Sequence, residues 1–195
     1  MPTYVHYFYN PAQPTGTTDD PFMLGSANSD EVARRFGLPL HFWDELLTHG
    51  SDWAFVIQLH ALLEAAVNQA LATAGQVRRK EDGRASISKK RERLVSLGKL
   101  DAELDGFFRV LSGIRNRYAH DVAQVYTSLG AIFTALPDQD IETLILPSTA
   151  RRPIPRYAID DARNWPREVL VYGSTHVLAA TQAGPSERCD PVTQA

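Results

Sequence analysis

The chain has 195 residues, with 20 Lys and Arg against 23 Asp and Glu, and its net charge is −3 at neutral pH. This length and a hydrophobic content of 44% favour one globular domain with extensions. No apolar run reaches the ~18 residues of a membrane-spanning helix, and the first ten residues lack the features of a secretory signal. The single cysteine, Cys189, excludes an internal disulfide and a cysteine-based zinc site. We therefore expect a cytoplasmic protein that does not associate with membranes.

Residues 1–28 contain four prolines and two glycines, which predicts a turn-rich arm instead of a domain. Its aromatic residues are too apolar for a free tail, and we expect them to dock on the body or on a partner. They are Tyr4, Tyr7, Phe8 and Tyr9. A short helix is expected to begin at Ser29, and another to run from Pro39 to about Thr48.

Three amphipathic helices follow the arm. The first, over 52–74, is ended by Gly75 and is apolar on two sides, which is typical of the central helix of a helical fold. The second covers 88–97. The third is capped by Asp101 and runs to about Ala119. Helical spacing predicts that its inward face consists of Leu104, Phe107, Phe108, Leu111, Ile114 and Tyr118.

The region after residue 120 is less regular. We expect a further helix from about Asp121 to Ala135, and an extended linker over 146–156, which holds three prolines. A last helix is expected to begin at Pro166, although Val-Leu-Val-Tyr-Gly within it is also compatible with a strand. Residues 184–195 are expected to be disordered. Because no series of strands occurs, the predicted class is all-α.

The third amphipathic helix ends in Ile-Arg-Asn-Arg-Tyr-Ala-His, residues 114–120. This run resembles the signature of the HEPN superfamily, in which an arginine, a polar residue and three further residues precede a histidine. Residues 59–65 and 94–100 resemble two other elements of its mannitol-operon-repressor-like branch. The resemblance covers about residues 50–135. It implies an HEPN-like antiparallel helical bundle over 29–145. The proline-rich linker and last helix over 146–183 lie outside the resemblance.

Helical geometry separates the two signature residues. Each residue of an α-helix advances by ~100°, so Arg115 and His120 lie ~140° apart and cannot both face one small target. Arg115 follows the apolar stripe, whereas His120 shares a polar face with Arg109 and Asn116. Two copies of this helix brought together would place Arg115 of one chain near His120 of the other, and fraying of the last turn would also bring the pair closer. Members of the family commonly form such dimers with a composite site, so a homodimer is expected.

Arginine binds phosphate through paired hydrogen bonds, and histidine exchanges protons near neutral pH. The resemblance implies a metal-independent endoribonuclease without a cofactor, which leaves 2′,3′-cyclic phosphate ends on RNA. In this interpretation Arg115 is the phosphate clamp, His120 the general acid and base, and Asn116 an orienting residue. The same resemblance implies a toxin or phage-defence component, silenced by a cognate antitoxin or regulatory protein.

Other interpretations remain open for the same residues. The signature also suits a helix end at which Arg117 and His120 complement the helix dipole. The protein would then be a non-catalytic helical regulator of the mannitol-repressor-like kind. A third interpretation is a nucleotide-binding module that uses Arg115 and the basic residues of 78–93 as a sensor. Arg117 either binds RNA or forms a solvated ion pair with Asp121, four residues later.

His60 and Glu64 lie one helical turn apart on an apolar stripe of the helix over 52–74. No further histidine or cysteine ligands occur at suitable spacing, so we do not expect a metal site. The pair is either a buried hydrogen-bonded pair, or Glu64 is a supporting residue that orients Arg115 or His120.

Residues 78–93 form a basic stretch, in which eight basic residues stand against three acidic ones, a net charge of +5. Such a stretch can follow a phosphate backbone, although a solvated surface loop has the same composition. Together with Arg117, the RNA-binding candidates are Arg78, Arg79, Lys80, Arg84, Lys89 and Lys90.

Overall fold

The structure is a computed structural model, and it describes residues 33–34, 36–39, 41–48, 50–75, 85–148 and 156–182. Every regular element within these ranges is a helix, which confirms the all-α class. The aromatic arm, the start of the helix expected at Ser29 and the C-terminal tail lie outside the described residues. So do four of the basic candidates, Arg78, Arg79, Lys80 and Arg84.

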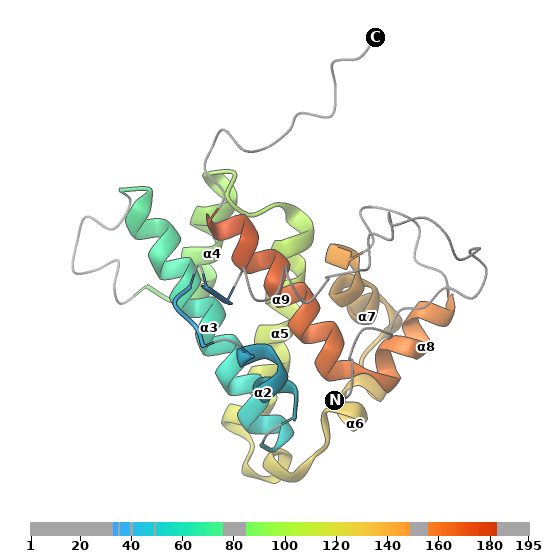
Figure 1. The fold of residues 1–195 in the computed structure, drawn as a ribbon. Helices are drawn as coiled ribbons and strands as arrows, with labels where there is room; N and C mark the ends of the chain where they lie inside the picture. The colour runs from blue at the N-terminus through green and yellow to red at the C-terminus, as the bar shows by residue number, and fades with distance from the viewer. Residues whose placement is uncertain are drawn as a thin grey trace, which may run out of the picture.

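Three helices form the centre of the molecule: α3 (Asp52–Thr73), α5 (Ala102–His120) and α9 (Pro166–Gln182). Each of them packs against the other two. In Figure 1, α9 crosses between α3 on one side and α7 (Asp138–Ile145) on the other. Their apolar side chains form one continuous core, whose largest fully buried members include Phe55, Leu59, Phe107, Phe108, Phe133 and Ile141.

Shorter helices cover this centre. They are α2 (Phe42–Thr48), α4 (Ile87–Ser96), α6 (Leu129–Thr134), α8 (Arg156–Asn164) and the 3₁₀ segments η2 (Val122–Tyr126) and η3 (Leu146–Ser148). Helix α4 packs on α3, α7 on α5, and α8 on α7 (Figure 1). The core includes Ile159, Ala162 and Leu178, so the helices beyond residue 145 pack into the same unit as those before it.

The helix ends follow local sequence signals. Gly75 and Gly98, each two residues after the end of α3 or α4, both have a φ in the left-handed region that glycine adopts without steric cost, at 66° and 63°. Asp101 caps α5, since its carboxylate accepts a hydrogen bond from the backbone N–H of Leu104 at 2.9 Å. All six residues expected on the inward face of α5 are buried. The predictions for these helices are confirmed.

Glycine at position 173 permits the closest approach between α5 and α9. A Cβ atom added there would lie 2.1 Å from Cε2 of Phe107, far inside van der Waals contact. The ring of Phe107 is completely buried against the α9 backbone at this point. The run Val-Leu-Val-Tyr-Gly, which was also compatible with a strand, is helical and belongs to α9. Its glycine, Gly173, is required by the packing against Phe107.

Several predictions about the second half of the chain were wrong. One helix was expected from Asp121 to Ala135, but η2 and α6 occupy this region, because Ser128 caps a new helix at α6. Helices α7 and α8 were not expected. The linker expected over 146–156 is 3₁₀ at its start and helical at its last residue, while 149–155 lie outside the described residues.

One helix in the described ranges, α3, is long and apolar enough to cross a membrane. Half of its most apolar window is buried within the protein, where α4, α5 and α9 pack on it. These contacts are those of the core helix of a helical domain. Trp53, at the first turn of α3, is 39% exposed.

Candidate functional site

The signature residues occupy the last two turns of α5. Arg115 is half-buried and its Nη1 donates to Oδ1 of Asn116 at 3.1 Å. Asn116, Arg117 and His120 are exposed, and neither Arg117 nor His120 forms a hydrogen bond or ion pair with a described residue. This end of α5 thus presents two guanidinium groups, an amide and an imidazole to solvent.

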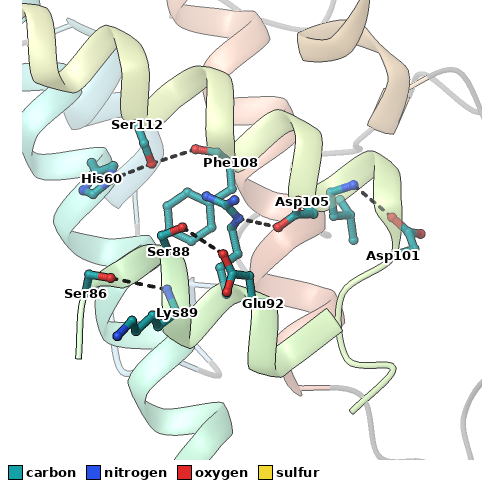
Figure 2. A network of polar contacts seen from close by, with 11 residues as sticks. His60, Ser86, Ser88, Lys89, Glu92, Asp101, Asp105, Phe108 and Ser112 are labelled. Carbon is teal, nitrogen blue, oxygen red and sulfur yellow. Dashed lines mark hydrogen bonds and ion pairs between the residues drawn. The ribbon is translucent and has the colours of Figure 1, made fainter. Parts of the chain in front are cut away.

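A polar contact from α3 reaches the buried side of the same helix. Figure 2 shows His60 of α3 directed at Ser112 of α5, where His60 Nε2 lies 3.1 Å from Ser112 Oγ. The Ser112 hydroxyl donates to the backbone carbonyl of Phe108 at 2.8 Å. Because the hydroxyl has only one proton, Nε2 of His60 must be the donor to Ser112 Oγ. The ring of His60 also packs edge-on against Phe108, with centroids 5.5 Å apart.

His60 is therefore a buried imidazole in a defined tautomer. It is 4% exposed, and burial lowers its pKa below the ordinary histidine value. Glu64 opposes this lowering of the His60 pKa, whereas the positive charge of Arg115 adds to it. His60 Nδ1, which is unprotonated in this tautomer, lies 3.8 Å from Glu64 Oε2. The charges of Glu64 and Arg115 thus act on the protonation of His60 in opposite directions.

Glu64 was expected either to pair with His60 in the core or to orient a signature residue. It does face His60, but the distance of 3.8 Å is too long for a hydrogen bond. No hydrogen bond or ion pair joins Glu64 to Arg115 or His120. The polar contact that sequence reasoning missed is His60 to Ser112, whose partners are 52 residues apart and share no local pattern.

The outward face of α5 is polar and contains a glycine. Arg109, Gly113, Asn116 and His120 are all exposed and recur every three or four residues, so they follow one side of the helix. A Cβ atom added to Gly113 would meet nothing within 4 Å. Packing inside the protomer therefore does not require a glycine here, although glycine in a helix interior costs about 0.5–1 kcal/mol relative to alanine.

The chain continues from His120 directly into η2, which has no buried residue. Its side chains Val122 and Tyr126 are 83% and 92% exposed, the two largest values among the exposed large apolar residues of the described ranges. Asp121 does not pair with Arg117 as one interpretation expected. Its carboxylate instead accepts from the backbone N–H of Ala123 at 2.9 Å and caps η2. Sequence reasoning missed Tyr126, because it placed this residue in a regular helix.

The described part of the basic stretch is only partly available to a ligand. Lys89 is exposed and Lys90 is half-buried on α4. Arg91 is buried, where it forms an ion pair with Asp105 of α5. Glu92 accepts a hydrogen bond from Ser88 at 3.2 Å (Figure 2). Part of the positive charge in this stretch thus joins α4 to α5.

No group of three or more histidine, cysteine or acidic side chains in the described ranges is arranged to hold a metal ion. A surface pocket of about 330 Å³ between α2 and α3 is lined by Phe42, Glu45, Leu46, Gly50, Ala54 and Gln58. Its single charged residue is acidic, so it does not suit a phosphate group. The end of α5 is the better candidate for an anionic substrate.

Comparisons with protein-family models, with characterised proteins and with solved structures found no match. The resemblance to the HEPN superfamily therefore depends on residues 59–65, 94–100 and 114–120 of this chain. These segments belong to α3, to α4 with the turn that follows it, and to the end of α5. Helix α3 packs against both α4 and α5, so the three segments belong to neighbouring elements.

Proposed function

We propose that this protein is a metal-independent endoribonuclease of HEPN type, that its helices α3 to α6 correspond to the HEPN-like bundle, and that it acts in the cytoplasm. The observation that carries the proposal is the end of α5. Arg115 is ordered by Asn116 at 3.1 Å, and Arg117 and His120 are exposed without partners among the described residues. Cations beside an accessible histidine suit the phosphate of RNA and the proton transfers that its cleavage needs.

In the proposed reaction, the ribose 2′-OH attacks the adjacent phosphorus while the bond from phosphorus to the 5′ oxygen breaks. His120 of one protomer takes the proton of the 2′-OH, and His120 of the other gives a proton to the leaving 5′ oxygen. The guanidinium of Arg115 balances the charge that develops on the phosphorane oxygens. The products are a 2′,3′-cyclic phosphate and a 5′-hydroxyl.

The angular separation of the signature residues supports a composite site. Arg115 and His120 lie ~140° apart around α5, so one helix does not direct both at the same phosphate. Two α5 helices that cross at Gly113 would place the two signatures against each other, since glycine lets backbones approach closely. The glycine has no packing role within the protomer, which supports this crossing point.

The rival function is a non-catalytic regulator that binds a protein through the polar face of α5. The same exposed residues would then contact the partner, and RNA would not be cleaved. A toxin held by a cognate antitoxin combines both properties, because the antitoxin would cover the end of α5.

The deciding experiment is cleavage of bulk cellular RNA and tRNA in EDTA. Wild-type protein should cleave, while Arg115→Ala and His120→Ala should each lose at least about a hundredfold in rate, the usual contribution of one acid–base or electrostatic group. Arg115→Lys is the matched control: it keeps the charge but not the paired donors, and should retain intermediate activity. All variants must keep the melting temperature and oligomeric mass of the wild type. A folded wild-type dimer without any cleavage would instead favour the regulator.

A further inference from the structure

Segment η2 holds its side chains outside the core in a fixed conformation. At its start, Asp121 caps it through the N–H of Ala123 at 2.9 Å and accepts from Gln124 Nε2 at 3.3 Å. At its end, the buried hydroxyl group of Tyr118 donates to the carbonyl of Thr127 at 2.9 Å. Although both ends are anchored, no side chain of η2 is buried.

A second anchor lies just beyond Thr127. The backbone N–H of Leu129 donates to Asp52 Oδ2 at 2.7 Å, and Arg167 holds the other carboxylate oxygen of Asp52. The first turns of α3, α6 and α9 thus meet two residues after Thr127 in the chain, at Leu129. The backbone that carries Tyr126 is therefore held in place before any ligand binds, and binding through its ring would cost little ordering entropy.

The end of α5 that leads into η2 carries basic side chains. Arg117 and His120 lie in the last turn of α5 and are exposed, and Arg115, five residues before His120, is half-buried. The one carboxylate between Arg115 and Tyr126 is that of Asp121, and both of its oxygens accept hydrogen bonds from η2. An exposed aromatic ring that follows these basic residues in the chain complements a chain of phosphates that carries unpaired bases.

We infer that Tyr126 is a base-stacking residue, on which an unpaired base next to the bound phosphate rests its face. The ligand is single-stranded RNA, because bases inside a duplex are stacked on one another and have no free face for the ring. This inference deepens the proposed function and rests on it for the position of the phosphate, at Arg115 and His120. It adds a specificity determinant, the selection of unpaired over paired RNA.

Binding can be measured without cleavage in the His120→Ala background, with a fluorescein-labelled 12-nucleotide single-stranded RNA and fluorescence anisotropy. The comparison ligands are the same length of RNA as a duplex, and a strand with the same phosphates but abasic riboses. Adding Tyr126→Ala should weaken binding of the single strand about tenfold or more and leave the abasic strand unaffected. Tyr126→Phe should bind like the parent, since the ring face is retained. Val122→Ala, which changes the other exposed residue of η2, is the matched control and should bind like the parent.

Equal affinity of the parent and Tyr126→Ala for the single strand would overturn the inference. So would a shift to monomer mass in both Tyr126→Ala and Val122→Ala, because η2 would then be a contact between two copies. Failure of the nuclease proposal has a different signature: wild-type protein would not cleave in EDTA, while the binding difference caused by Tyr126 would persist. Conversely, cleavage that depends on His120 but not on Tyr126 would support the nuclease proposal and overturn the inference that Tyr126 stacks on a base.

Discussion

Asp52 and Arg167, which are 115 residues apart in the chain, bind each other through Arg167 Nε and Asp52 Oδ1 at 2.8 Å. Arg167 also donates to the carbonyl groups of Leu47 and Gly50 at 2.8 and 3.1 Å, and its guanidinium lies 5.0 Å from the ring centre of Phe55. One arginine thus joins the end of α2 and the start of α3 to the start of α9. The same carboxylate anchors α6, so this contact positions the segment that follows the proposed site.

Loss of this arginine should destabilise the whole fold. Arg167→Met keeps the length of the side chain but leaves Asp52 Oδ1 and two carbonyl groups without their donor, and should lower the free energy of unfolding by about 2–4 kcal/mol. Arg163→Met is the matched control, because its partner Asp138 is more exposed than Asp52 and the pair bridges only peripheral helices. It should cost less than half as much in urea unfolding. An equal loss of unfolding free energy in the two variants would show that Arg167 contributes no more to stability than Arg163 does.

The two neighbours of His60 should move its pKa in opposite directions. Glu64 raises the His60 pKa and Arg115 lowers it. Glu64→Gln should therefore lower the pKa of His60 further, and Arg115→Leu should raise it, as followed by the NMR signals of the ring during a pH titration. If the His60 pKa shifted in the same direction in both variants, or did not shift, Glu64 and Arg115 would not act on His60 as described.

Burial of neutral histidines should make the protein less stable in mild acid. Burial lowers the pKa of both His60 and His176 in the folded state below the ordinary value of 6.5. The unfolded chain therefore binds more protons, and stability that is present above pH 6.5 is lost as the pH falls through the folded-state values. The melting temperature should fall below pH 6.5, and it should fall less in His60→Gln. An unchanged acid dependence in that variant would contradict the assignment to His60.

Tyr118 should cause a corresponding loss of stability at alkaline pH. Burial, with a contribution from Asp52, raises the pKa of Tyr118 to about 12, against a lowering contribution from Arg167. Because the unfolded tyrosine ionises first, near pH 10, stability should decrease between pH 10 and about 12. Tyr118→Phe should remove part of this alkaline dependence and cost about 1 kcal/mol at neutral pH through the lost hydrogen bond to Thr127. Unfolding by urea at pH 8 and pH 11 tests both statements.

Two glycines should respond oppositely to the same substitution. Gly173→Ala places a methyl group against Phe107 and should destabilise the protein by about 1–3 kcal/mol, since the ring has no space to move. Gly130→Ala meets nothing within 4 Å and should instead stabilise α6 by about 0.5–1 kcal/mol. Chemical denaturation of both variants provides the comparison. If Gly173→Ala left the free energy of unfolding unchanged, α5 and α9 would not be in close contact at this point.

Substitutions of Gly113 test whether two copies of α5 form the proposed dimer contact. In a monomer, Gly113→Ala should stabilise α5 by about 0.5–1 kcal/mol, and Gly113→Leu should be tolerated at this open position. If two copies cross here, Gly113→Leu should convert the protein to monomers in sedimentation and abolish cleavage while the fold remains. An unchanged mass together with full cleavage would place the dimer contact elsewhere.

Much of the helical structure follows from the sequence alone. Spacing of apolar residues predicted α3 and the buried face of α5, Asp101 predicted the cap of α5, and Gly75 predicted the end of α3. These signals are local, because they act within one or two turns of the helix that they define. The same spacing predicted that Arg115 and His120 lie on different sides of α5, and the structure leaves Arg115 half-buried and His120 exposed.

Only the tertiary structure decided which polar side chains meet. In the sequence, Arg91 does not differ from the other basic residues of its stretch, whereas in the structure it is buried in an ion pair with Asp105. His60 contacts Ser112, which lies 52 residues later in the chain. Periodicity shows that a face is apolar but not which helix will cover it, so contacts between distant residues leave no local pattern. For the same reason the exposure of Tyr126 was unforeseen: the chain leaves regular α-helix after His120, and no neighbouring helix covers its ring.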